Sequence, residues 1–403
     1  MATLIFRHAA QLIGVAPSFT VIEDGAVVVQ DERIRWLGPT ADLPSVPPDA
    51  EILDVAGKVI VPGLVDSHTH LLFAGARASE FEQRLQGQSY QEIAERGGGI
   101  NATVQSVRQA SKEELKRLAR QRLKHLLSFG VTTVEVKSGY GLTLADELKC
   151  LEAISELNAE GPLELVPTFL GAHAVPPEYR NDRAGYIRLL IDEMLPEIAR
   201  CGLAEFCDVF CEKGVFSISE SEEILRKAKN LGFRLKLHAD ELSPLGGAEL
   251  AGRLGATSAD HLLCITDAGM DALARSGTIA TLLPGTAFFL GVPYAPARKL
   301  IERGVTVALA SDCNPGTCPT ENLPLVGTMA CTQMRMLPSE VIRAMTIHAA
   351  AALGRADRLG SLEVGKQADL IVLDVPSYPH LFYHFGVSHV ERVIKRGRVV
   401  YPA

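Results

Sequence analysis

Apolar, β-branched runs alternate with helical patterns over most of the chain. Segments 221–232 and 267–277 repeat apolar residues at helical spacing, whereas the runs between such segments are continuously apolar. Eight runs are of this kind: 64–70, 132–141, 163–173, 205–212, 234–241, 256–261, 278–285 and 306–316. Continuous apolar strands separated by helices indicate parallel strands buried on both faces. Eight of them predict an α/β fold, the closed (β/α)8 TIM barrel.

Both ends of the chain show a different pattern, in which short strands are separated by turn residues. The runs are 26–30, 33–39 and 50–63 near the beginning, and 368–376 and 390–402 near the end. The simplest arrangement is one small sheet domain built from residues 1–60 and 359–403. The barrel, residues 61–358, would then be a continuous insert.

Polar side chains fall at the carboxyl ends of the predicted barrel strands. They are His68, His70, Tyr140, His173, His238, Glu241, His261 and Asp312. Because the carboxyl ends of barrel strands converge on one mouth, we expect these residues to share a pocket. Segment 71–110 is too long for an ordinary loop after a strand, and it carries Arg77 and Tyr90. We expect it to fold over the mouth.

The spacing of His68 and His70 is that of two metal ligands. On a strand, residues i and i+2 project to one face about 6.6 Å apart, although two hydrogen-bonded histidines near a strand end would show the same spacing. With His238 and Asp312 they form a nitrogen and oxygen donor set suited to Zn²⁺ or Fe, with one position left open. Such an ion lowers the pKa of water from 15.7 to about 7, so the predicted reaction is hydrolytic.

Three residues at the mouth are candidates for proton transfer and charge stabilisation. Asp312 could relay a proton, and Glu241 is the other candidate acid or base. His261 could stabilise a growing oxyanion or, alternatively, orient Glu241 or Asp312. The sequence does not divide the proton transfers between them.

Composition narrows the possible partners. The net charge of −8 argues against a nucleic-acid partner, and the basic stretch 112–125 has leucines at the spacing of an amphipathic helix. No apolar run approaches the roughly 18 residues of a membrane span, and Arg7 and His8 interrupt the first apolar segment. Eight cysteines without a CxxC pair indicate reduced thiols. We therefore expect a cytoplasmic protein that acts on a small-molecule substrate.

Several motifs resemble the amidohydrolase superfamily: VIVPGLVDSHTH leading into the first barrel strand, ASDCNPG at the eighth, and LGSLEVGKQADLIVLD near the end. EVKSGYGL, FLGAHAVPPEY and LHADEL resemble, more narrowly, the imidazolonepropionase family within it. The resemblance implies a barrel joined to a small β-sandwich built from both termini, and a homodimer. It also implies hydrolysis of the cyclic amide of 4-imidazolone-5-propanoate to N-formimidoyl-L-glutamate, in histidine degradation.

The resemblance also assigns roles to individual residues. It implies that one Zn or Fe ion is held by His68, His70, His238 and Asp312, and that Glu241 and His261 join Asp312 in catalysis. The implied substrate contacts are Arg77, Tyr90, Tyr140, His173, Glu241, Asn314, Gly316 and Thr317. A guanidinium such as that of Arg77 suits the propanoate, because it offers two parallel donors to a carboxylate.

Alternatives remain for residues and for function. Arg77 could be a surface arginine, and Tyr140, between two glycines, could be a turn aromatic. Two-metal members of the amidohydrolase superfamily usually bridge their ions with a carbamylated lysine on the fourth strand. This strand has no lysine before Lys213, so the resemblance favours one metal and leaves Glu212 as a conceivable second ligand. Another mononuclear amidohydrolase, such as a heterocycle deaminase, is the nearest alternative activity. A catalytically dead assembly protein is a remote one.

Overall fold

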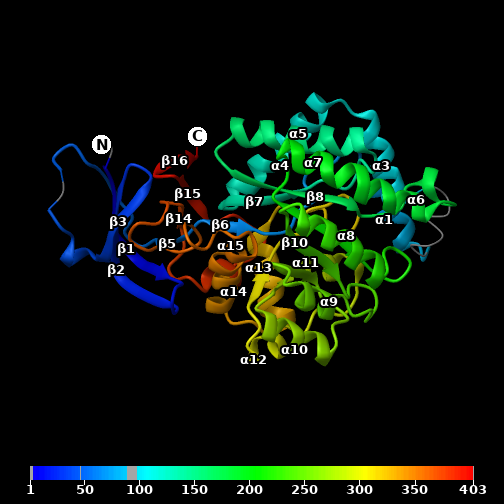
Figure 1. Cartoon of the computed structure of the whole chain (residues 1–403). Helices are drawn as coiled ribbons and strands as arrows, with labels where there is room; N and C mark the ends of the chain where they lie inside the picture. Colours follow the sequence, from blue (N-terminus) through cyan, green and yellow to red (C-terminus); the bar gives the residue numbers. More distant parts are fainter. Residues whose placement is uncertain (1–2, 46, 89–97, 403) are drawn as a thin grey trace.

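The computed structural model describes residues 3–45, 47–88 and 98–402. It has two parts, which lie side by side in Figure 1. One is a barrel of strands surrounded by helices. The other is a sheet that contains both ends of the chain, so strands from the beginning and from the end of the sequence belong to one sheet.

The predicted barrel is confirmed. Among the described residues, its sheet has eight parallel strands that pair in sequence order. They are β6 Leu64–Asp66, β7 Val131–Lys137, β8 Glu164–Ala172, β9 Phe206–Cys211, β10 Arg234–Ala239, β11 Ser258–His261, β12 Ile279–Leu282 and β13 Val307–Leu309. The first and last strands meet beyond their ends, where Thr69 bridges Cys313. His70 N donates to Cys313 O at 3.0 Å, and Asp312 N donates to His68 O at 3.0 Å.

Helices surround the barrel, and side-chain caps fix where several of them begin. In α8, Ser217 and Glu220 form a reciprocal capping box. The helices are α1 Ala78–Leu85, α3 Ile100–Gln109, α4 Lys112–Ser128, α5 Leu144–Glu160, α6 Arg183–Arg188, α7 Leu195–Cys201, α8 Ile218–Asn230, α9 Gly247–Leu254, α10 Asp267–Ser276, α11 Pro284–Leu290, α12 Ala297–Glu302, α13 Leu323–Met334, α14 Pro338–Ala344, α15 Ile347–Ala352 and α16 His380–Tyr383. Shorter turns are η1 Thr40–Asp42, η2 Pro177–Tyr179 and η3 Leu189–Met194. The helices predicted at 112–125, 221–232 and 267–277 are α4, α8 and α10.

Apolar side chains fill the amino-terminal end of the barrel. Val166 and Phe206, from two barrel strands, belong to the same buried cluster as Ala349 and Leu353, from α15 and the residue after it. This packing closes the end of the barrel opposite the ligand residues. It leaves the carboxyl ends of the strands for chemistry.

The two chain ends form one mixed sheet, as the sequence predicts. Its strands are β1 Thr3–Gly14, β2 Thr20–Gln30, β3 Arg33–Pro39, β4 Glu51–Asp54, β5 Val59–Pro62, β14 Leu370–Leu373, β15 Val390–Lys395 and β16 Arg398–Tyr401. They run in the order β16-β15-β14-β5-β1-β2-β3, and β4 also pairs with β1. Strand β1 was not among the predicted strands. Its register shifts between Phe6 and Ala9, and His8 has a φ of 61°, so its residues do not alternate regularly between faces.

The long segment after β6 contains helices α1 and α3 within its described residues. Tyr90, predicted to contact the substrate, lies outside the described residues. Among the helices described, none is both long and apolar enough to cross a membrane.

Candidate active site

One cavity of about 500 Å³ opens at the carboxyl ends of the barrel strands. Its lining includes most of the residues singled out from the sequence: His70, Arg77, Tyr140, His173, His238, Glu241, His261, Asp312, Asn314 and Thr317. His68 lies beneath it and is fully buried. Residues from β10, β11 and the segments after β6, β7, β8 and β13 therefore come together.

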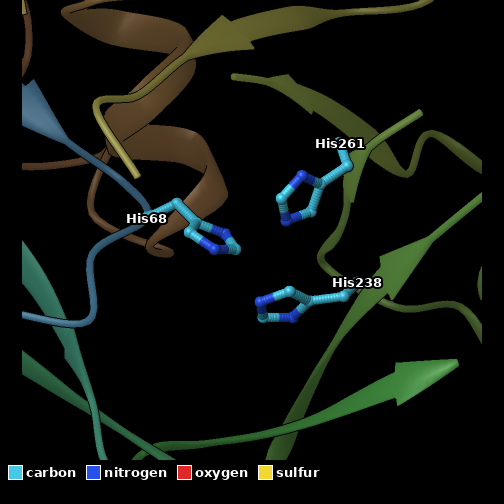
Figure 2. Close-up of side chains that lie close together, drawn as sticks. All are labelled: His68, His238 and His261. Atoms are coloured by element: carbon cyan, nitrogen blue, oxygen red, sulfur yellow. The ribbon is translucent and has the colours of Figure 1, made fainter. Parts of the chain in front are cut away.

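The imidazole rings of the candidate ligands converge. His70 Nε2 lies 3.2 Å from His238 Nε2, and Asp312 Oδ1 lies 3.6 Å from His68 Nε2 and 3.7 Å from His70 Nε2. Two ligands about 2.1 Å from one tetrahedral ion are about 3.4 Å apart, which is close to these separations. Figure 2 shows the rings of His68, His238 and His261 turned toward a common space, and their ligating atoms lie within 4.8 Å of one another.

Several buried ligating atoms at this site have no hydrogen-bond partner among the described residues. His68 Nε2 and Asp312 Oδ1 are two such atoms, as are both ring nitrogens of His261. Burial, followed by the charge of Lys137, holds the pKa of His68 well below its usual range. Burial and the neighbouring His173 do the same for His70. Both rings are therefore neutral, as metal ligation requires, and the site fits a divalent ion.

Charged side chains inside the barrel support the ligands from behind. We call Glu135, Lys137, Asp208, Lys236 and Asp260 the interior cluster; all five are fully buried. Asp208 Oδ2 lies 2.9 Å from His238 Nδ1, and Asp260 Oδ2 lies 2.6 Å from His68 Nδ1. Each carboxylate therefore places the ring N–H on Nδ1 and turns Nε2 toward the ion site. Burial opposes the charged form of His238, but the carboxylate of Asp208 outweighs it and raises the pKa of His238.

Two lysines neutralise these carboxylates. Lys137 Nζ lies 2.8 Å from Asp208 and 2.9 Å from Glu135, and Lys236 Nζ lies 3.0 Å from Glu135. None of the five residues of the interior cluster was predicted from the sequence. The available signal was charge inside buried strands: Glu135 and Lys137 share one strand face, and Lys236 precedes His238 by two residues on another.

The two acidic residues that face the cavity differ in pKa. Burial, followed by the nearby charge of Asp312, raises the pKa of Glu241 to about 8. Burial also raises the pKa of Asp312, but a hydrogen bond from Thr286 and the charge of His238 limit the rise to about 6. Glu241 therefore keeps its proton to a higher pH than Asp312 does. Such a pair can act as acid and base.

His261 and Asp312 adopt strained backbone conformations. Their φ angles are 77° and 54°, in the left-handed region that side chains other than glycine rarely occupy. His261 Nε2 lies 3.6 Å from Glu241 Oε2, too far for a hydrogen bond. Burial and the neighbouring His238 hold the pKa of His261 well below its usual range, so the ring is a neutral donor.

The predicted substrate-contacting residues after β13 form a tight turn. Asn314 Oδ1 accepts from the backbone N–H groups of Gly316 at 2.8 Å and Thr317 at 2.7 Å. Arg77 lies against this turn, because a Cβ on Gly316 would come within 2.1 Å of Arg77 Nη1. Any larger residue at 316 would displace the guanidinium. Arg77 Nε donates to Glu80 at 2.8 Å, and its terminal nitrogens have no hydrogen bond to another described residue.

Glu212 does not face the ligands. Its carboxylate accepts from the backbone N–H groups of Leu242 at 2.8 Å, Ser243 at 3.3 Å and Lys213 at 2.8 Å. The conceivable role as a second metal ligand finds no support, because no group of potential ligands within the described ranges includes Glu212. Glu212 instead holds the segment that carries Glu241.

Comparisons with known proteins agree with the fold and the site. The model of the amidohydrolase family matches residues 94–401, so the chain belongs to this class of hydrolases. Imidazolonepropionase of Symbiobacterium thermophilum is 54% identical to it over 94% of this chain and 91% of its own length. That of Geobacillus kaustophilus is 50% identical over 99% and 98%. Within the amidohydrolases, the chain is a member of the imidazolonepropionase family.

A solved structure supports the fold. An adenosine deaminase from Xanthomonas campestris with bound zinc matches 99% of this chain and 92% of its own, with a TM-score of 0.74 and 20% identity. At this identity the likeness concerns the architecture.

Proposed function

We propose that this enzyme hydrolyses the cyclic amide of 4-imidazolone-5-propanoate to N-formimidoyl-L-glutamate, in histidine degradation. The main structural support is that two features meet at one cavity. One is a set of buried ligating atoms without hydrogen-bond partners among the described residues, and the other is the guanidinium of Arg77. The donors suit a hydrolytic ion and the guanidinium suits a propanoate. About 50% identity to imidazolonepropionases over nearly the whole chain supports the same substrate.

His68, His70, His238 and Asp312 would hold one Zn²⁺ or Fe ion in this proposal. The ion, when bound, would supply Lewis-acid chemistry and acidify water. Asp208 and Asp260 would keep the ligand rings in the tautomer that leaves Nε2 free. His261, whose nitrogens lie within ligating distance of His68 and His238, would remain a catalytic residue.

The difference in pKa between Glu241 and Asp312 suggests how protons move. In the reaction, water adds its oxygen to the ring carbonyl carbon, and the adjacent carbon–nitrogen bond breaks. Ionised Asp312 would take the proton from water, and protonated Glu241 would give one to the leaving ring nitrogen. The neutral ring of His261 would donate to the developing oxyanion.

Binding of the substrate would use the remaining residues of the cavity. Arg77 would pair with the propanoate, and Tyr140 and His173 would contact the ring beside His70. Asn314, Gly316 and Thr317 would contact the substrate or the formimidoyl-glutamate skeleton. Tyr90 stays a predicted contact.

We also propose the coarse organisation of the enzyme. Residues 1–60 with 359–403 would form one domain and 61–358 the catalytic barrel. A homodimer in the cytoplasm is proposed from family membership.

Product analysis tests the reaction. Freshly prepared 4-imidazolone-5-propanoate is given to metal-replete enzyme, and products are followed by mass spectrometry together with an assay for ammonia. We expect N-formimidoyl-L-glutamate, one water heavier than the substrate, without ammonia. Release of ammonia with an intact ring would indicate a heterocycle deaminase instead. Absence of both products would contradict the proposal.

A further inference from the structure

The loop that carries Tyr140 needs support from elsewhere in the fold. We call residues 138–142, between β7 and α5, the Tyr140 loop. Gly139 has a φ of 99°, and Leu142 has a φ of 56°, which is uncommon for a side chain of its size. Such conformations persist only where surrounding groups hold them.

One buried carboxylate accepts hydrogen bonds from the backbone N–H groups of this loop. Glu147, on the first turn of α5, is fully buried. Its carboxylate accepts from Gly139 N at 3.1 Å, Gly141 N at 2.9 Å and Leu142 N at 2.8 Å. None of the ion pairs among residues 3–45, 47–88 and 98–402 involves Glu147. Burial raises the pKa of Glu147, and the hydrogen bonds from Leu142, Gly139 and Gly141 act against that rise. The loop N–H groups are therefore the groups that stabilise its carboxylate.

The Tyr140 loop in turn places two residues of the cavity. The ring of Tyr140 lies 5.8 Å from that of His70 and 5.2 Å from that of His173. The carbonyl oxygen of Gly139 accepts from His173 Nδ1 at 3.0 Å, which puts the N–H on Nδ1 and leaves Nε2 as an acceptor. The His173 ring stacks on His70 at 4.9 Å.

We propose that Glu147 is a positioning residue for substrate binding, which acts through the Tyr140 loop on Tyr140 and His173. The inference rests on the proposed function, since it takes these two residues as substrate contacts. A carboxylate suits the position because it can only accept, and three donors converge on it. Glutamine has the same shape, but its amide NH₂ would face one or more of these N–H groups.

The test compares Glu147→Gln with Glu152→Gln, an exposed glutamate on the same helix that pairs with Lys112. KM and kcat for 4-imidazolone-5-propanoate and the metal content are measured for both variants. We expect E147Q to raise KM about tenfold with metal content unchanged, because small displacements of binding groups are costly. E152Q should match the wild type.

A double-mutant cycle separates positioning from a purely structural role. Tyr140→Phe should raise KM in the wild type and have a smaller effect in E147Q, since Glu147 acts partly through Tyr140. Additive effects on KM would overturn the inference, as would an unchanged KM in folded E147Q.

A second variant changes the loop side of the contact between Glu147 and the Tyr140 loop. In Gly141→Ala the new Cβ would lie 2.7 Å from Glu147 N, so the loop must move away from the helix while the carboxylate is kept. Gly141→Ala should raise KM as E147Q does. If E147Q does not fold, this variant tests the positioning role of Glu147 in its place. An unchanged KM would contradict the inference. Wild-type enzyme without the expected product would instead overturn the proposed function.

Discussion

Two groups of charged residues, one fully buried and one partly buried, lie at different levels of the barrel and serve different purposes. The interior cluster lies beneath the ligand histidines. The other group, which we call the seam cluster, consists of Glu164, Arg355, Arg358, Asp369 and Lys395, at the junction of the barrel with the terminal sheet. Glu164 Oε1 lies 3.1 Å from Arg355, and Lys395 Nζ lies 2.7 Å from Asp369.

The two clusters differ in the groups that their charged side chains contact. The ion pairs of the seam cluster join acid to base and hold β8 to β15 and to the segment after α15. In the interior cluster, Asp260 hydrogen-bonds to His68 and Asp208 forms an ion-pair contact with His238. On the other side of these rings, His68 Nε2 and Asp312 Oδ1 have no hydrogen-bond partner among the described residues. Charges paired among themselves indicate stability, whereas charges that orient unpartnered donors indicate a ligand.

The largest effect is expected from removing a lysine of the interior cluster. Lys137→Met leaves Asp208 and Glu135 buried without their shared cation, which should lower the free energy of unfolding by about 3–5 kcal/mol. It should also abolish tight metal binding. Urea unfolding and metal analysis of the purified protein measure the two effects.

Lys395→Met is the matched control, because Lys395 is a buried lysine of the seam cluster. It should destabilise the protein to a similar degree and leave metal binding intact. Equal loss of metal in both variants would remove the distinction between the clusters.

The second prediction concerns the pH dependence that the seam cluster gives to stability. Burial alone would raise the pKa of Glu164, but the hydrogen bond from Arg358 and the charge of Lys395 outweigh it and lower the pKa to about 2. A lowered pKa stabilises the fold above the usual value of 4.5, and this is lost as pH falls toward 2. Glu164→Gln should therefore cost on the order of 3 kcal/mol at pH 7.

The difference between E164Q and the wild type should shrink as the pH falls from 4.5 toward 2, as followed by urea unfolding at several pH values. If the difference in the free energy of unfolding stayed constant with pH, Glu164 would stabilise the fold through its shape and not through its charge. Metal content at pH 7 should be unchanged.

A smaller effect is expected from a carboxylate of the interior cluster. Asp208→Asn keeps the shape but loses the strong acceptor for His238 Nδ1–H, so metal affinity should fall about 10- to 100-fold. Competition with a chelator of known affinity measures the change. Asp369→Asn is the control in the seam cluster, and weakening of metal binding there would count against the account.

Replacement of Arg77, which belongs to neither cluster, is expected to have the smallest effect on stability and metal binding. Arg77→Ala should raise KM about tenfold, because one charge-assisted contact to the propanoate is lost. Stability and metal content should match the wild type. Loss of metal would show that the arginine is structural.

Much of this arrangement could be predicted from the sequence, for identifiable reasons. Eight continuous apolar runs predict the barrel, and the rule that strand ends converge brings His68 and Asp312 together across 244 residues. The first strand was missed because its bulge at His8 breaks the alternation of faces.

The interior cluster and the contact of Arg77 with Gly316 lay beyond the sequence argument. Charges inside a buried strand do not reveal which partners face them across the barrel. The need for glycine at 316 follows only from the position of a guanidinium on a distant segment.

The most direct test of the central claim is a metal titration of chelated enzyme. Zn²⁺, or Fe²⁺ without oxygen, is added in steps while bound metal and formation of N-formimidoyl-L-glutamate are followed together. We predict that activity rises from near zero and saturates at one equivalent per chain, and that Asp312→Asn shows no such saturation. Full activity without metal, or saturation only at two equivalents, would contradict the account.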